Sequence, residues 1–317
     1  MRLLLFIAVL MASTFASLAG ATEGLVLLNK IATAARALNY TGAFVYRRAG
    51  HEETSSIAHA LVDGREIERI VVLDGSPREV VRQGQQVSCF LPEEDLLIIE
   101  DQSRQQRFPA LLPAGLSDLT RYYSVKPGGK SRVAGIDAQT IILEPKDALR
   151  YAHELWMDPI SGLLLKSTLL GERGQILESF SFTQVNIGGV VDPAALRPHY
   201  ESSVHKVHKV RSDEMRADEL GWNFKEIPFG FRKLNAMKRK NPNQGQDSLQ
   251  VVFSDGLAAI SVFIEPSLVT EKEPGIGSFG PMHVYRRKAG DFRLIVIGEV
   301  PADAVRRLGD GIERKLR

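Results

Sequence analysis

The chain has 317 residues, of which 44% are hydrophobic and 25% are charged, and its formal net charge is +2. This length allows two domains with an ample core, and the composition excludes a disordered or collagen-like chain. A net charge so close to zero gives no argument for nucleic acid as a partner, and none is predicted.

The N-terminus reads as an export signal. Met1 and Arg2 precede an apolar run over 3–11, and the small residues of 17–21 end in an Ala-x-Ala site, so cleavage is expected after Ala21. The run is shorter than the roughly 20 apolar residues that a membrane span needs. We therefore predict a signal peptide over 1–21 and an exported, soluble protein.

An amphipathic helix and a strand meander are expected next. Leu28, Ile31, Ala35 and Leu38 recur on one stripe of a helix over 25–38. Turn signals then arrive every ten or so residues, which is typical of a meander. The strands are expected over 41–48, 54–62, 67–73, 78–82 and 87–91. Cys89 is the only cysteine, so an intrachain disulfide is excluded, and its apolar strand favours a buried, inert thiol.

The regular pattern breaks after the run Leu96-Leu97-Ile98-Ile99, which lies between acidic residues. Residues 104–119 carry two prolines and a repeated apolar theme, which is too apolar for a surface loop and too broken for a long helix. We expect short helices or a lid that covers a sheet face. Strands resume over 122–125, 131–133 and 138–144.

Residues 151–188 predict three antiparallel strands joined by two short turns, at 158–162 and 171–175. In the third strand, Ile176, Phe180 and Phe182 share one face, while serines and a threonine lie mainly on the other. This pattern suits an antiparallel sheet whose apolar face is turned toward a core or a cavity.

A change of domain is predicted after residue 190. Two prolines and the loss of alternation mark 191–219 as a linker or crossing segment between a large domain, 22–190, and a small domain, 220–317. Residues 200–211 could form the last strand of the large domain or part of the crossing. In the small domain we expect hairpins around 254–256 and 289–291, loops over 237–246 and 270–280, and a helix over 302–308.

No motif predicts catalysis, a cofactor or a metal. His205 and His208 would point to opposite faces of a strand, which works against one shared ion. The segment 128–131 resembles the end of a phosphate-binding loop, but Ser occupies position 124, where that motif requires Gly. We predict no enzyme activity; a hydrolase that uses His153 or Glu94 is the alternative, to be tested by a turnover screen.

Seven stretches together resemble the MucB/RseB family of regulators of the envelope-stress sigma factor. They occur in the family's order over nearly the whole mature chain, and their collinearity is what makes the resemblance specific. They are 40–46 (YTGAFVY), 131–135 (SRVAG), 156–182, 228–231 (PFGF), 254–258 (SDGLA), 261–266 (SVFIEP) and 296–301 (VIGEVP).

The resemblance implies an α+β fold that is mostly antiparallel β. A large LolA/LolB-like open half-barrel would be followed by a smaller sheet domain with a helix. It also implies a periplasmic protein that binds the periplasmic domain of a membrane-spanning anti-sigma factor of the RseA/MucA type and shields it from site-one proteolysis. Lipid or lipopolysaccharide would release the partner. A periplasmic lipid or lipoprotein carrier is the alternative function, and a homo-oligomer is compatible with either.

Two sets of candidate site residues follow, with ordinary core packing as the alternative for both. A lipid cavity would gain about 0.8 kcal/mol for each buried methylene. Its candidate lining is Phe44, Tyr46, Leu97, Ile99, Phe108, Leu111, Leu112 and Trp156. The candidate partner-binding residues, drawn from an aromatic cluster and from runs of basic residues, are Trp222, Phe224, Phe229, Phe231, Arg239, Arg286 and Arg287.

Overall fold

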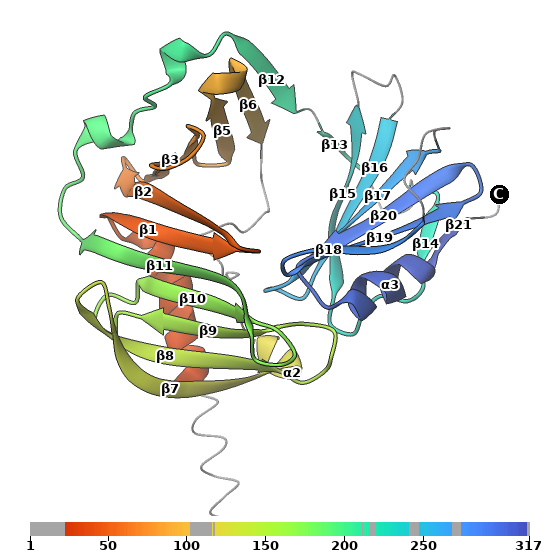
Figure 1. Ribbon diagram of the computed structural model, residues 1–317, viewed down its shortest axis with the longest axis horizontal. Helices are drawn as coiled ribbons and strands as arrows, with labels where there is room; N and C mark the ends of the chain where they lie inside the picture. The colour runs from red at the N-terminus through yellow and green to blue at the C-terminus, as the bar shows by residue number, and fades with distance from the viewer. Residues whose placement is uncertain are drawn as a thin grey trace, which may run out of the picture.

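The fold consists of one large curved sheet and one smaller sheet, joined near their edges (Figure 1). The computed structural model describes residues 23–101, 116, 118–210, 212–215, 220–240, 247–267 and 274–315, with the side chains of 101, 212–214, 239, 240 and 247 excepted. The predicted signal peptide and most of the predicted lid therefore lie outside the described residues. Among these residues, no helix combines the length and the apolar character needed to cross a bilayer.

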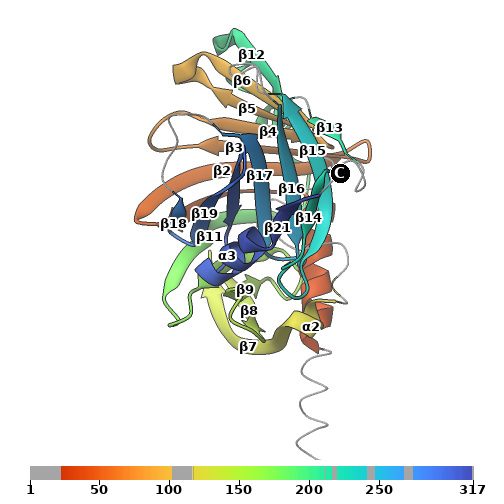
Figure 2. The same cartoon turned by 90° about the vertical axis from the view of Figure 1, so that its right-hand side faces the viewer.

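The large sheet has 12 strands in the order β12-β6-β5-β4-β3-β2-β1-β11-β10-β9-β8-β7. Neighbouring strands pair antiparallel, except that β12 runs parallel to β6. The sheet is strongly curved and does not close on itself (Figures 1 and 2). The predicted open, mostly antiparallel architecture is therefore confirmed. The strands are β1 (Tyr40–Arg48), β2 (His51–Val62), β3 (Arg65–Val72), β4 (Glu79–Gln83), β5 (Gln86–Leu91), β6 (Leu96–Asp101), β7 (Tyr123–Val133), β8 (Ile136–Pro145), β9 (Ala152–Met157), β10 (Leu164–Leu170), β11 (Ile176–Ile187) and β12 (Lys206–Val210).

A helix over 23–37 packs against one face of this sheet, which we call the inner face. Its apolar stripe, with Leu28 and Ile31, meets side chains of β7 to β10 in a closed core, so the predicted amphipathic helix is confirmed. Gly162 adopts φ +86° in the turn before β10, where a Cβ would lie 2.6 Å from Lys30 of the helix. A close helix-to-turn approach therefore requires glycine at this position.

The other face of the sheet, the outer face, is covered by the chain that leaves β11. This segment contains the short helices η2 (Pro193–Leu196) and η3 (Glu201–Ser203). Val191 and Leu196 pack on Ala58 and Ala60 of β2, and further along Val204 packs on the outer side of β4 and β5. The segment then ends in β12, so the open choice for residues 200–211 is resolved in favour of a last strand of the large sheet.

Glu79 of β4 fixes this covering segment. Its carboxylate has no exposed surface, accepts hydrogen bonds from the backbone N–H groups of His199 and Tyr200 at 2.9–3.0 Å, and pairs with Arg69. Arg69 also donates to the carbonyl of Ala195. A buried carboxylate satisfied in this way holds the covering segment in register on the sheet.

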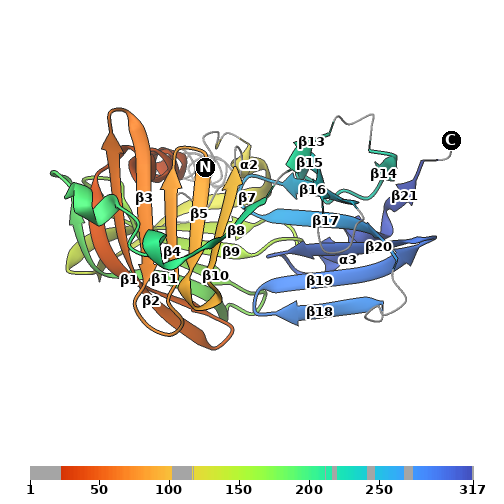
Figure 3. The same cartoon turned by 90° about the horizontal axis from the view of Figure 1, so that it is seen from above.

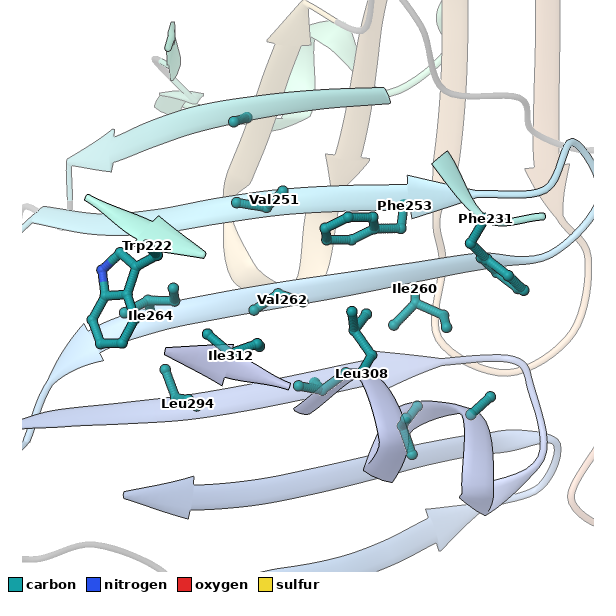
Figure 4. Packing of buried hydrophobic residues seen from close by; sticks show 14 of the residues in the cluster. Trp222, Phe231, Val251, Phe253, Ile260, Val262, Ile264, Leu294, Leu308 and Ile312 are labelled. Atoms are coloured by element: carbon teal, nitrogen blue, oxygen red, sulfur yellow. The ribbon is translucent and has the colours of Figure 1, made fainter. Parts of the chain in front are cut away.

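The small domain is a seven-stranded sheet with one covered face. Its order is β13-β15-β16-β17-β20-β19-β18, and its core is built under a helix and a separate two-stranded ribbon, β14 with β21 (Figure 4). Figure 3 shows no helix of the described residues on the opposite face of this sheet. The elements are β13 (Ser212–Glu214), β14 (Trp222–Phe224), β15 (Arg232–Lys240), β16 (Asp247–Ser254), β17 (Ala259–Pro266), β18 (Gly275–Phe279), β19 (Met282–Ala289), β20 (Phe292–Gly298), α3 (Ala302–Asp310) and β21 (Ile312–Arg314).

Two expected loops proved to be strands in part. Residues 237–240 belong to β15 and residues 275–279 form β18, although their basic and glycine-rich compositions favour loops. Sheet neighbours supply the hydrogen bonds that local propensity does not predict. The three-stranded prediction for 151–188, the hairpins at 254–256 and 289–291, and the helix after Pro301 are confirmed.

Candidate functional site

A fully buried arginine joins the two domains. Arg150 lies in the segment before β9, and its side chain has no exposed surface. Its Nε lies 3.0 Å from Oδ2 of Asp255, which belongs to the small domain, and its Nη2 donates to the carbonyl of Phe229 at 2.5 Å. Its Nη1 lies 3.2 Å from Asp147 of the large domain. One cation therefore holds polar groups from both domains in a place from which water is excluded.

Aromatic rings surround this guanidinium. Its central carbon lies 5.1 Å from the ring centre of Tyr122, 5.7 Å from that of Tyr123 and 5.2 Å from that of Phe231. The faces of these rings attract the cation and replace part of its lost hydration. We call Arg150, Asp255, Tyr122, Tyr123 and Phe231 the interdomain joint.

Asp255 is fixed from its own side of the joint. Its Oδ1 accepts the N–H groups of Leu257 and Ala258 at 2.9 and 2.8 Å, and its Oδ2 accepts the hydroxyl of Tyr123 at 3.3 Å. Burial raises the pKa of Asp255, while these N–H groups and Arg150 oppose the shift. The β16–β17 turn is thus locked to the start of β7.

The β1–β2 hairpin makes a second and more exposed contact with the small domain. Arg48 lies 3.0 Å from Glu299 and 3.9 Å from Glu178 of β11, and the His51 ring is 6.2 Å from that of Phe279. Burial, and then the nearby Glu299 carboxylate, raise the pKa of Glu178 to about 7. A hollow of about 510 Å³ opens beside this hairpin, between it and β10–β11.

The inner face of the large sheet carries a transverse apolar row. Pairing places Ile57, Ile70, Val80, Cys89 and Ile98 directly beside one another across β2 to β6. Ile57 is buried, whereas the other four are half-buried. The described helix covers the β7–β10 half of this face instead. The row is therefore the part of the inner face that the described helix leaves uncovered.

Charged groups lie next to the apolar row. Glu68 is almost fully buried, 3.8 Å from Arg82, and burial raises its pKa to about 7. His59 stacks on Tyr40, with ring centres 4.8 Å apart, and lies 3.3 Å from Glu66. Burial therefore favours the protonated form of Glu68, which lies beside the apolar row, although Arg82 and His59 oppose that shift.

The lining candidates fall in different places. Phe44 lies in the core with Phe180 and Phe182, and Tyr46 packs beside them on the same face. Trp156 is half-buried, and Nζ of Lys166 lies 4.3 Å from its ring centre. Phe108, Leu111 and Leu112 lie outside the described residues.

Two of the predicted lining residues, Leu97 and Ile99, lie on the outer face and not in the inner row. Leu97 packs on the outer face against Val204 and Tyr200, and alternation along β6 places Ile99 on that same face. Their neighbour Ile98 is the residue that joins the inner row. A shift of one residue along a strand exchanges its faces, and the run of four apolar residues over 96–99 has no alternation from which the two faces could be told apart.

The partner-binding candidates also separate. Trp222 and Phe231 are buried in the small-domain core, and Phe224 packs against it, so fold packing accounts for them without a partner. Phe229 is 62% exposed and contacts Tyr122. Arg287 donates to the carbonyls of Gly309 and Ile312, which makes it a structural residue. Arg286 is half-buried, and the side chain of Arg239 lies outside the described residues. Partner contact by these residues stays a prediction.

The sequence analysis did not predict the interdomain joint. Arg150 and Asp255 are 105 positions apart, and neither belongs to a motif that predicts burial. The only available signal was the Ser254-Asp255-Gly256 turn, which predicted a hairpin and nothing further. Among the described residues, no group of three or more His, Cys, Asp or Glu side chains is arranged to hold a metal ion.

Comparison with known proteins places this architecture among sigma factor regulators. Residues 23–200 match the MucB/RseB N-terminal domain and residues 216–313 match the MucB/RseB C-terminal domain. The sigma factor AlgU regulatory protein MucB of Pseudomonas aeruginosa is 33% identical over 311 residues, which cover 96% of this chain and 95% of that protein.

Two solved MucB structures are similar to this chain over nearly its whole length. A crystal structure of MucB in complex with MucA(peri) is similar with a TM-score of 0.73 at 31% identity, covering 94% of this chain and 100% of that one. The Pseudomonas aeruginosa MucA/MucB complex gives a TM-score of 0.75 at 31% identity, covering 93% and 100% of the two chains.

Proposed function

Because this chain belongs to the MucB/RseB family, we propose that it is a periplasmic regulator that binds the periplasmic domain of a membrane-spanning anti-sigma factor. The observation that carries the proposal is its similarity, over nearly its whole length, to a MucB that was solved with MucA(peri). Both domains take part in that similarity, so the binding platform is proposed to need the two of them.

The bound partner is shielded from proteolysis in this proposal. A periplasmic segment held on the two-domain platform would be less accessible to the site-one protease. The regulator would thereby keep the sigma factor inactive until the partner is released.

Lipid binding on the inner face would release the partner. The half-buried row Ile70, Val80, Cys89 and Ile98 supports this step, because acyl chains would cover it at a gain of about 0.8 kcal/mol for each methylene. Release requires that lipid bind more tightly to the partner-free protein, since equal affinity for both states would shift nothing.

A protection assay tests the regulatory proposal. The periplasmic domain of the anti-sigma factor is incubated with the site-one protease, with and without the mature protein. We expect cleavage to slow in proportion to complex formation, and lipopolysaccharide to restore it. An unchanged cleavage rate at saturating regulator would refute the shielding role.

A lipid or lipoprotein carrier is the second candidate, and the apolar row is the observation that favours it. Cys89 lies inside the row and is the only cysteine of the chain, so a fluorophore attached there reports on the inner face alone. A carrier would take lipid from donor vesicles and deliver it to acceptor vesicles, changing the Cys89 signal in both steps. Lipid uptake without delivery would leave only the regulatory proposal.

A further inference from the structure

The two sheets end in four edge strands, and three of these carry the residues that usually prevent further strand pairing. β7 contains Lys126, Pro127, Lys130 and Arg132; β12 contains Lys206 and Lys209; β13 contains Asp213 and Glu214. Charged residues and proline at an edge discourage the addition of another strand.

The fourth edge strand lacks this protection. β18 has the sequence Gly-Ile-Gly-Ser-Phe, with no charged residue and no proline, and it pairs with β19 alone. All five of its residues are exposed, and Ile276 and Phe279 keep 48% and 53% of their surfaces in contact with solvent. Its free edge presents unpaired backbone groups beside two exposed apolar side chains.

The two glycines of β18 leave space for the side chains of an added strand. A Cβ built on Gly275 would meet nothing within 4 Å, and one built on Gly277 would meet only Nη1 of Arg286, at 3.9 Å. Neither conformation nor crowding by the described residues explains glycine at position 277. The space above Gly275 and Gly277 is therefore empty of described residues, and the guanidinium of Arg286 in β19 lies at its border.

Arg286 supplies the charge at this edge. Among the described residues it makes no ion pair, whereas Arg293 of the same sheet pairs with Glu265 and Arg287 is held by backbone carbonyls. Beyond Phe279 the edge leads to the β1–β2 hairpin, whose His51 ring lies 6.2 Å from that of Phe279 (Figure 3). Arg47 of this hairpin is already paired with Glu52. The edge is therefore apolar at Ile276 and Phe279, with the guanidinium of Arg286 on its flank.

We propose that the free edge of β18 binds an extended, acidic segment of the anti-sigma factor's periplasmic domain by strand addition. This inference rests on the proposed function and names the surface through which it acts. Backbone hydrogen bonds to β18 would give affinity, and a carboxylate of the segment would pair with Arg286 over the gap at Gly277.

A second copy of this chain fits the edge less well. β18 carries no carboxylate, so an edge-to-edge dimer would leave both Arg286 guanidinium groups without an acidic partner at the new pairing. Charge complementarity thus favours an acidic peptide over self-association.

Hydrogen exchange of the mature protein, with and without the purified periplasmic domain of its anti-sigma factor, provides the first test. We expect slower exchange of amides in 275–279 on binding, because strand addition satisfies N–H groups that now face water. Binding without such protection would overturn the strand-addition site while leaving the proposed function intact. An absence of binding would overturn both.

Charge reversal provides the second test. Arg286→Glu should raise the Kd for the same domain at least tenfold in low salt, with a smaller effect in high salt, and Ile276→Lys should raise it by blocking the edge. Lys130→Glu, which makes the same charge change on the β7 edge, should leave Kd within twofold. Equal effects of Arg286→Glu and Lys130→Glu would overturn the site. Protection of 275–279 that rises with protein concentration in the absence of partner would instead assign the edge to a second copy.

Discussion

Replacing Arg150 with Met should uncouple the two domains. The side chain of Met retains much of the apolar stem of Arg but removes the cation, which leaves the carboxylate of Asp255 buried and without its partner. Removing one member of a buried ion pair typically costs about 3–5 kcal/mol. The hydrogen bond to Phe229 and the three ring contacts disappear as well, so we expect a loss at the upper end of that range.

The loss should depend on pH. Without Arg150, burial raises the pKa of Asp255 further, and a carboxyl group whose pKa is higher in the folded protein destabilises it as pH rises. The Met variant should therefore lose more stability at pH 8 than at pH 5. Adding Asp255→Asn should restore part of the stability at pH 8, because the buried charge is then gone.

Calorimetry separates this effect from general destabilisation. The wild-type protein should unfold with the two domains coupled, and Arg150→Met should split the transition in two. Lys126→Ala is a matched control, because it removes a cation from an exposed pair with Glu144 and should cost less than about 1 kcal/mol. A single transition within about 1 kcal/mol of wild type for Arg150→Met would refute the role assigned to the joint.

Three further predictions concern single side chains. Burial raises the pKa of Glu68 to about 7, so the folded protein binds its proton more tightly than the unfolded chain, and stability should fall as pH rises from about 4.5 to about 7. Glu68→Gln should flatten this part of the profile in urea titrations, and an unaltered slope would contradict the assignment. Glu79→Ala should free the covering segment, so that chymotrypsin cuts after Tyr200 faster than in a variant of equal global stability; equal cleavage rates would show that Glu79 does not hold the segment. Phe44→Ala should cost about 3–5 kcal/mol in chemical denaturation, against less than about 0.5 kcal/mol for the exposed Ile160→Ala, and a cost below 1 kcal/mol would place Phe44 outside the core.

Much of the large domain was predictable because its strands carry local signals. Turn residues at regular spacing located β1 to β5, and the glycine-containing turns located β9 to β11. The helix over 23–37 was visible from its apolar stripe. In these elements the residues that the pattern marks as apolar are the ones that pack into a core, so the local signal and the folded structure agree.

The missed features depend on contacts between distant segments. β18 has two glycines among five residues, so only its pairing with β19 makes it a strand. The faces of β6 follow from its register with β5, which placed Ile98 rather than Leu97 and Ile99 on the inner side. Trp222 and Phe231 resembled a partner surface because an aromatic cluster looks the same in sequence whether it fills a core or meets a ligand.

The connection between the sheets has a mechanical consequence. β12 ends at Val210 and β13 begins at Ser212, so a single residue separates the edge of one sheet from the edge of the other. Tilting the small sheet about the Arg150 contact would therefore pull on β12, which five residue pairs hold to β6. Because Ile98 of β6 belongs to the apolar row, a movement of the small sheet would reach the inner face through β12 and β6.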